Sequence, residues 1–225
     1  MPVNKEAYIR IKAELDAKKV TLVAVSKTKP VADILELYES GQRDFGENYV
    51  QEMVDKAGQL PKDIRWHFIG HLQTNKIKLI APFVQLIHGV DSLKLLEAIN
   101  KEAGKNSRVM DCLLQVHIAD EETKFGLDEK EIDLMISQFE NLKMLNARIC
   151  GLMGMASFTD DRSQVKKEFH HLKELFDLYA KPQTSNLKLQ TLSMGMSSDY
   201  KVALEEGSNM VRIGSLLFGE RPAAG

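Results

Sequence analysis

A lysine closes the first strongly apolar run of the sequence. Residues 21–27 read Thr-Leu-Val-Ala-Val-Ser-Lys, and Pro30 follows shortly afterwards. A short apolar run that is rich in valine and bounded by a turn signal is typical of an interior parallel strand. The Lys27 amine would then emerge at the edge of the core, where partial desolvation lowers the pKa of an amine and suits it to Schiff-base chemistry. Position alone fits an ordinary solvated lysine better, because most lysines stay exposed.

Two segments near the carboxyl end of the chain have the composition of a phosphate site. Residues 193–199 read Ser-Met-Gly-Met-Ser-Ser-Asp, and Gly214 and Ser215 follow the last apolar run. Backbone N–H groups at a helix N-terminus, together with serine hydroxyls, bind anions. A plain N-cap role for Ser197 or Ser198 would also explain the first segment. The two segments together favour phosphate binding.

Arg212 and His67 are the remaining candidates for contact with a ligand. Arg212 would point inward from the last strand, where an unpaired guanidinium is costly to bury. It therefore needs either a ligand atom or a carboxylate such as Glu47. His67 lies in an apolar run at 66–71 and is interpreted either as a ligand contact or as an ordinary core histidine. The histidines show no metal-ligand spacing, and no metal site is expected.

The candidate residues lie far apart in the sequence, so a fold must bring them together. The alternation of apolar runs and amphipathic segments along the chain predicts that fold. An amphipathic helix is expected at about 4–18. Strands are expected near 21–27, 44–48, 66–71, 86–90, 111–118, 148–155, 189–194 and 210–218. Helices are expected between them at 31–40, 49–57, 75–81, 92–103, 129–139, 162–179 and 198–206. Such alternation predicts an α/β fold, a single (β/α)8 barrel of the TIM type, with a doubly wound open sheet as the alternative.

In such a barrel the carboxyl ends of the strands share one face, so the candidate residues should meet at one mouth. No linker divides the chain. One domain is therefore expected over residues 1–225, with an N-terminal helix in 1–19 and the barrel in 20–219.

Composition excludes several classes of protein. The 225 residues carry 30 basic and 32 acidic side chains, which argues against nucleic-acid binding. No apolar stretch is long enough to span a membrane, and residues 1–19 lack the core of a signal peptide. Cys112 and Cys150 lie in apolar surroundings without a metal or CxxC spacing, so two buried free thiols in a reducing compartment are expected. The sequence therefore predicts a soluble cytoplasmic protein.

Several of these motifs together resemble the pyridoxal phosphate homeostasis protein family, whose members are small proteins similar to the barrel domain of alanine racemase. The resemblance covers about residues 20–221. It is carried by the segments 24–27, 45–48, 66–80, 192–199 and 211–214. It implies the barrel of the alanine racemase N-terminal domain.

The resemblance also implies a cofactor and the residues that hold it. Lys27 would form an internal aldimine with pyridoxal 5′-phosphate (PLP), and Arg212 would face the pyridine nitrogen. A guanidinium does not give up its proton, so that nitrogen should stay unprotonated, which weakens PLP as an electron sink. The other cofactor-binding residues implied are Ser197, Gly214 and Ser215 at the phosphate, Asn48 and His67 beside the ring, and Ser193 and Met196 in the same site.

The function implied is vitamin B6 homeostasis, in which the protein buffers or delivers PLP without efficient catalysis and PLP-dependent apoenzymes are candidate partners. The alternative is an amino-acid racemase or decarboxylase of the same barrel type. Such racemases have a second, β-rich domain that supplies a catalytic tyrosine. This chain ends about seven residues after residue 218, so a monomer without that domain is expected.

Four further points stay open in the sequence. Tyr49 lies near a predicted strand end, where a helix-packing role is expected. A third hypothesis is a phosphometabolite barrel in which Lys27 only donates to an ion pair. If Lys27 is not the anchor, the next candidates are Lys29, Lys76 and Lys124. The loop at 123–126 has no assigned role.

Overall fold

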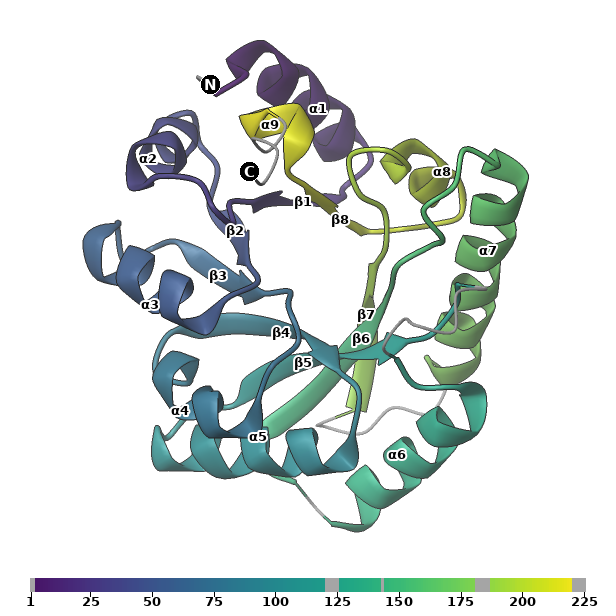
Figure 1. The fold of residues 1–225 in the computed structure, drawn as a ribbon. Coiled ribbons are helices and arrows are strands. Elements are labelled where there is room, and N and C mark those ends of the chain that lie inside the picture. Colours follow the sequence, from purple (N-terminus) through teal and green to yellow (C-terminus); the bar gives the residue numbers. More distant parts are fainter. Residues whose placement is uncertain (1–2, 120–125, 143, 181–186, 220–225) are drawn as a thin grey trace, which may run out of the picture.

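The computed structural model is a closed barrel of eight parallel strands in sequence order (Figure 1). It describes residues 3–119, 126–142, 144–180 and 187–219. The sheet closes where β1 pairs with β8, with Val23 opposite Arg212. The predicted (β/α)8 barrel is therefore confirmed, and the open doubly wound sheet is excluded because that sheet has two free edges.

The strands and helices alternate along the chain, and Figure 1 shows the helices outside the strands. The strands are β1 Thr21–Val25, β2 Asp44–Glu47, β3 Arg65–Phe68, β4 Val84–Val90, β5 Met110–Val116, β6 Ala147–Gly154, β7 Leu187–Ser193 and β8 Met210–Ile213. The helices are α1 Lys5–Ala17, α2 Val31–Glu39, α3 Val50–Gln59, η1 Thr74–Lys76, α4 Ile77–Ile80, α5 Leu93–Lys105, α6 Glu129–Asn141, α7 Arg162–Tyr179, α8 Tyr200–Glu205 and α9 Ser215–Phe218.

The N-terminal helix α1 completes the outer layer of helices. It packs against β1 and α9, and Figure 1 shows it between α2 and α8. The Asn4 side chain caps α1 by accepting the N–H of Ala7 at 3.0 Å, and Ile11 and Leu15 are buried on its inner face. Because α9 is a single turn, α1 covers apolar strand surface that a short final helix leaves open.

The last strand is shorter than the sequence predicts. It ends at Ile213, whereas the apolar run suggested a strand over 210–218. The N–H groups of Leu217 and Phe218 both donate to the Gly214 carbonyl at 2.9 Å, so the chain turns into α9 there. Both side chains are buried, so the run at 215–218 is the inner face of a helix.

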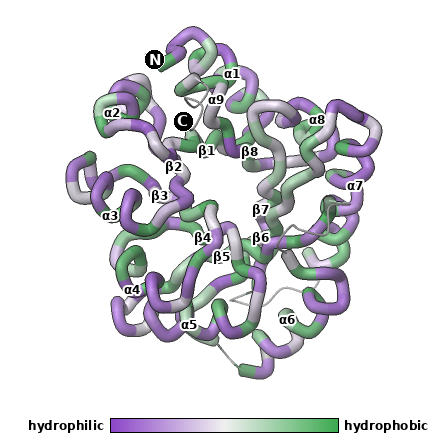
Figure 2. The backbone as a smooth tube through the Cα atoms, viewed as in Figure 1, coloured by the Kyte–Doolittle hydropathy of each residue, from purple (hydrophilic) through white to green (hydrophobic). Residues whose placement is uncertain are grey.

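The buried residues form two layers, one outside the strands and one in the lumen. Figure 2 shows hydrophobic residues along the strands and alternating hydropathy along the helices. Apolar side chains in the lumen include Val23, Leu86, Leu113, Met153 and Met210. Buried polar side chains His67, His88, Ser193 and Arg212 also project from strands. The lumen is therefore partly polar, and this polar part runs toward the mouth.

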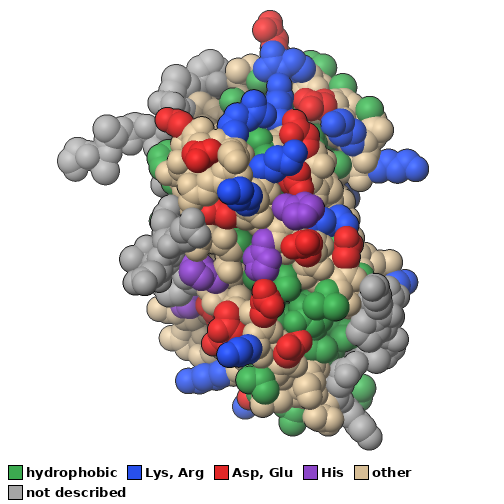
Figure 3. Space-filling view, turned by 90° about the vertical axis from the view of Figure 1, so that its right-hand side faces the viewer, with side chains coloured by type: hydrophobic (Ala, Val, Ile, Leu, Met, Phe, Trp, Pro, Cys, Tyr) green, Lys and Arg blue, Asp and Glu red, His purple; other side chains and the backbone are tan. Residues whose placement is uncertain are grey.

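The outer surface fits the balanced composition. On the face in Figure 3, Lys and Arg side chains are interspersed with Asp and Glu. Within the described ranges, no helix has the length and apolar character needed to cross a membrane. Both cysteines are free, as predicted. Cys112 is buried, but Cys150 is only half-buried, so the expectation that both thiols are buried is wrong for Cys150.

Candidate functional site

The carboxyl ends of the strands surround a cavity of about 560 Å³ that contains the lysine singled out by the sequence. β1 ends at Val25, and Lys27 lies half-buried two residues beyond it. The predicted site residues that line this cavity are Lys27, Asn48, Met196, Ser197, Arg212, Gly214 and Ser215. Residues that end or follow four different strands therefore line one cavity, as the barrel rule predicts.

The turn that carries Lys27 is held by a buried cation. The Lys56 ammonium, on α3, donates to the carbonyl of Ser26 at 2.7 Å, to Glu47 Oε1 at 2.8 Å and to Glu52 Oε1 at 2.7 Å. The Ser26 hydroxyl also donates to Glu47 Oε1 at 2.6 Å. Burial raises the pKa of Glu47, while hydrogen bonds from Lys56 and Ser26 oppose that rise. A buried lysine needs such partners, and together they fix the backbone directly before Lys27.

The next residue of the turn has an unusual backbone conformation. Thr28 has φ of +63°, a left-handed conformation that is uncommon for a β-branched residue. Its N–H donates to Glu52 Oε1 at 2.6 Å, the same oxygen that accepts from Lys56. Lys56 was missed in the sequence, because a lysine on a helix reads as a surface residue until its neighbours are known.

Arg212 is buried in the lumen at the floor of the cavity. Its Nη1 donates to the carbonyl and the Oγ of Ser193 at 2.9 and 2.6 Å, and its Nη2 donates to the carbonyl of Gly154 at 3.0 Å. Burial lowers the pKa of Arg212 to about 10, while the Asp199 charge opposes this. The alternative in which Glu47 pairs with Arg212 is wrong, since Glu47 pairs with Lys56. A guanidinium has five N–H groups, so two remain for a ligand.

The two serine- and glycine-containing loops meet at the mouth. The Gly214 N–H donates to Ser197 Oγ at 3.3 Å, and the Met196 N–H donates to Asp199 Oδ1 at 2.6 Å. Gly195 has φ of +98°, and a Cβ there would lie 2.6 Å from the Cβ of Ala203. Only glycine fits that position, which lets the loop after β7 fold back onto α8 and present its serines to the cavity.

Asn48 tests whether the cavity is built for a polar ligand. Its Oδ1 is buried and has no hydrogen-bond partner among the described residues, although buried side-chain oxygens are normally paired. Gly70 lets the chain after β3 pass close to Asn48, because a Cβ there would lie 2.3 Å from the Asn48 carbonyl oxygen. The geometry therefore leaves one amide at the cavity wall for a ligand to satisfy, and the residues present fit a phosphorylated aldehyde such as PLP.

His67 and Ser193 lie below the mouth. His67 is 2% exposed, and its Nε2 lies 3.0 Å from Asp44 Oδ1. It borders a different cavity, of about 420 Å³ and lined by residues from the starts of several strands. The prediction that His67 lies beside a ligand at the mouth is therefore wrong in position, because strand alternation gives the face of a residue but not its depth. Ser193 is fully buried and reaches the site through Arg212.

Two other candidates of the sequence, Lys29 and Tyr49, lie among the described residues. Lys29 lines the cavity, but its ammonium donates to the carbonyls of Phe218 and Gly219 at 2.8 and 3.2 Å. Tyr49 is 58% exposed, so its expected helix-packing role is wrong. Lys124 and the loop at 123–125 lie outside the described residues.

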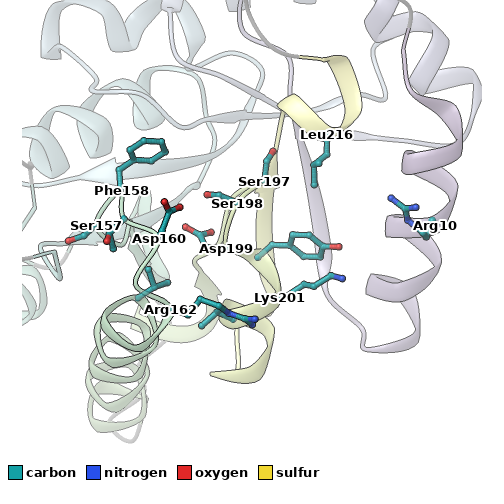
Figure 4. A pocket seen from close by; sticks show the side chains of 14 residues that line it. Arg10, Ser157, Phe158, Asp160, Arg162, Ser197, Ser198, Asp199, Lys201 and Leu216 are labelled. Carbon is teal, nitrogen blue, oxygen red and sulfur yellow. The ribbon is translucent and has the colours of Figure 1, made fainter.

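A third cavity, of about 720 Å³, adjoins the mouth. Figure 4 shows Arg10 projecting from α1 on one side, with Phe158 and Asp160 on the other. Ser197 and Ser198 line both cavities, so the serine-rich loop separates them. The mouth cavity is smaller than this one. It is nevertheless the candidate site, because it is lined by Lys27, Arg212 and Asn48, whose Oδ1 has no hydrogen-bond partner among the described residues.

The fold and the lysine at the mouth define a barrel of the alanine racemase type. The family model described as "Alanine racemase, N-terminal domain" matches residues 5–222. An alanine racemase from Bartonella henselae shares the fold, with a TM-score of 0.72 and 18% identity over 99% of this chain and 65% of that chain.

Relatives with higher sequence identity define the family more specifically. The pyridoxal phosphate homeostasis protein of Aquifex aeolicus is 42% identical over 201 residues, which are 89% of this chain and 86% of the relative. The protein of the same name from Escherichia coli K12 is 37% identical over 208 residues, 91% of this chain and 87% of the relative. PipY of Synechococcus elongatus, solved with PLP bound, has a TM-score of 0.86 and 34% identity over 95% of this chain and 99% of that chain. The chain belongs to the pyridoxal phosphate homeostasis protein family.

Proposed function

We propose that this protein binds PLP reversibly in the mouth cavity and takes part in vitamin B6 homeostasis by buffering or delivering it. The observation that carries the proposal is the meeting of Lys27, Arg212 and the Ser197–Gly214 contact around one cavity. The names of the relatives, and the structure of PipY with PLP bound, support it.

Each residue has a role that follows from its chemistry. Bound PLP supplies an aldehyde that bonds covalently to an amine, and Lys27 provides that amine. Ser197, Gly214 and Ser215 bind the phosphate with hydroxyl and backbone N–H groups. Arg212 would direct its remaining N–H groups at the ring nitrogen, and Asn48 and Met196 would line the ring. Because the Arg212 guanidinium keeps its proton, it would leave the ring nitrogen without one.

The lining of the cavity supports a holder of PLP rather than an efficient enzyme. Among the described residues that line it, there is no Asp, Glu, His, Tyr or Cys. Racemisation needs a proton donor on the face opposite the lysine, and the second lysine present, Lys29, already donates to two carbonyls. We therefore propose that the protein lacks the acid–base pair of a racemase. The alternative function is an amino-acid racemase or decarboxylase of the same barrel type.

A lysine exchange with a matched control tests the binding mode. Lys27→Ala should abolish the chromophore that PLP forms with the protein and that borohydride reduces, whereas Lys29→Ala, from the same cavity, should retain it. Loss of the chromophore in Lys29→Ala alone would move the anchor, and no chromophore in the wild type would favour the phosphometabolite barrel. Conversion of amino acids by the PLP-loaded protein at ordinary enzyme rates would favour the racemase or decarboxylase.

We further propose that residues 1–225 act as one domain, as a monomer and in the cytoplasm, with PLP-dependent apoenzymes as partners. The family match over residues 5–222 supports one domain. Two free cysteines support a reducing compartment. Light scattering of the purified protein checks the monomer, and a dimer would contradict it.

A further inference from the structure

A chain of buried polar side chains runs through the barrel below Arg212. Ser193 Oγ lies 3.3 Å from His88 Nδ1, and His88 Nε2 lies 3.0 Å from His67 Nδ1. His67 Nε2 lies 3.0 Å from Asp44 Oδ1. Ser193 is on β7 and His88 is on β4, which are not neighbours in the sheet. Their contact therefore crosses the lumen and links the mouth to the opposite end of the barrel.

The two ends of the chain have fixed hydrogen-bonding roles. Arg212 can only donate, and an ionised carboxylate can only accept. Burial raises the pKa of Asp44, but hydrogen bonds from Arg65 and His67 outweigh this and lower it to about 2, so the group is a carboxylate at neutral pH. If both rings are neutral, one order satisfies the two ends: Arg212 donates to Ser193, Ser193 to His88, His88 to His67, and His67 to Asp44.

This order assigns one tautomer to both rings. His88 accepts at Nδ1 and donates from Nε2, and His67 does the same, so in this order each ring carries its single proton on Nε2. His88 is fully buried, and burial, together with the neighbouring His67 and the Arg212 charge, lowers its pKa. A neutral His88 is therefore consistent with its surroundings.

Arg212 has an unusual set of partners for a buried cation. All three of its acceptors belong to the uncharged groups of Ser193 and Gly154. A buried charge is normally hydrogen-bonded to a carboxylate or to a ligand. Here the carboxylate of Asp44 is reached only through three intervening side chains. Each donor in such a series polarises the next, which makes Ser193 Oγ a better acceptor for Arg212.

We propose that Ser193, His88 and His67 are positioning residues that orient Arg212 through one directional chain ending at Asp44, so that a carboxylate at the amino end of the barrel affects how the mouth holds PLP. The inference rests on the proposed function only for its last link, the contact of Arg212 with PLP. The links from Arg212 to Asp44 belong to the protein alone.

The first test needs neither PLP nor a variant. Long-range ¹H–¹⁵N NMR of the histidine-labelled apoprotein reports which ring nitrogen carries the proton. We expect His67 and His88 both to be neutral and protonated on Nε2 near neutral pH. A proton on Nδ1 of either ring, or a doubly protonated ring, would overturn the directional chain.

The second test compares two carboxylates at the same end of the barrel. Asp44 accepts from Arg65 at 2.8 and 2.5 Å, and Asp111 accepts from Arg148 at 2.6 and 2.8 Å. Both carboxylates line the same cavity, but the hydrogen bond from His67 is made to Asp44. Asp111→Asn is therefore a matched control for Asp44→Asn, since each variant loses one arginine–carboxylate pair.

We expect Asp44→Asn to shift the ring nitrogen signals of His88, two links away, and to weaken PLP binding by about fivefold, as expected from the loss of roughly one buried hydrogen bond. It should also move the absorbance maximum of bound PLP. Asp111→Asn should do none of these. The proposal is overturned if Asp44→Asn leaves His88 and PLP binding unchanged, or if both variants change them equally. If the wild type fails to bind PLP, the proposed function is wrong, while the NMR result still decides the chain.

Discussion

Replacing Lys56 by methionine should destabilise the protein strongly, although Lys56 lies outside the mouth cavity. Lys56 is 5% exposed and Glu47 is fully buried, and they are 2.8 Å apart. Removing one partner of a buried pair leaves an uncompensated charge, which costs about 3–5 kcal/mol. Lys56→Met should therefore lower the free energy of unfolding of the apoprotein by that amount in urea, and the melting temperature by roughly 6–20 °C.

The pH dependence of this loss identifies Glu47 as its source. Burial already raises the pKa of Glu47 in the folded protein, and removal of the Lys56 cation should raise it further. A carboxyl whose pKa is higher in the folded state binds its proton more tightly there. Stability then falls as the pH rises from the unfolded pKa through the folded one. The loss in Lys56→Met should therefore be largest near pH 7.5 and smaller near pH 5.

Two further variants make the reasoning refutable. Glu47→Gln combined with Lys56→Met removes the stranded carboxylate, so the double variant should be more stable than Lys56→Met alone. Lys12→Met removes a partly exposed lysine paired with Asp16 and should change stability by less than about 1 kcal/mol. If Lys56→Met has as small an effect as Lys12→Met, or if the double variant is the least stable, the buried-pair explanation is wrong.

Two other predictions concern the mouth and the thiols. Gly195→Ala should lower the free energy of unfolding by about 1–3 kcal/mol and weaken PLP binding, because Gly195 has φ of +98° and a Cβ there would lie 2.6 Å from the Cβ of Ala203. The control Gly58→Ala, inside α3 with nothing within 4 Å of the new Cβ, should stabilise the protein slightly. Urea unfolding of the two variants compares their stabilities. Burial raises the pKa of Cys150 to about 12 and also raises that of Cys112. Alkylation of the thiols by iodoacetamide at pH 8 should therefore be slow in the folded protein and fast in urea. Fast labelling of the folded protein would contradict this explanation.

The sequence predicted the strands and the mouth because both depend on local patterns. An interior parallel strand reads as a continuous apolar run, and the barrel rule then places the strand ends at one face. Lys27, Arg212 and the two loops were brought to the same cavity by that rule, whereas Asn48 was implied by the resemblance to the family. The error at the last strand has the same origin, since a short apolar run fits a strand or the inner face of a one-turn helix.

The features that the sequence did not reveal depend on contacts between residues that lie far apart in the sequence. His67 is buried in the lumen, but its depth there depends on how far neighbouring strands are staggered, which strand alternation does not reveal. His88 was passed over, although it forms the centre of the polar chain. Lys56 looks like any helix lysine until α3 packs over β2 and brings Glu47 within reach. No local pattern reports such a distance.

These distant contacts explain how the mouth can hold a cofactor in a fixed orientation. The Lys56 contacts fix the turn before Lys27, and the chain to Asp44 fixes Arg212 from below. Both groups are thereby oriented before PLP arrives, which lowers the ordering cost of binding. Catalysis would need a further group that moves a proton on the far side of the cofactor. The supports from Lys56 and Asp44 lie beneath the cavity and act on the turn of Lys27 and on Arg212, as the proposed role of holding and releasing PLP requires.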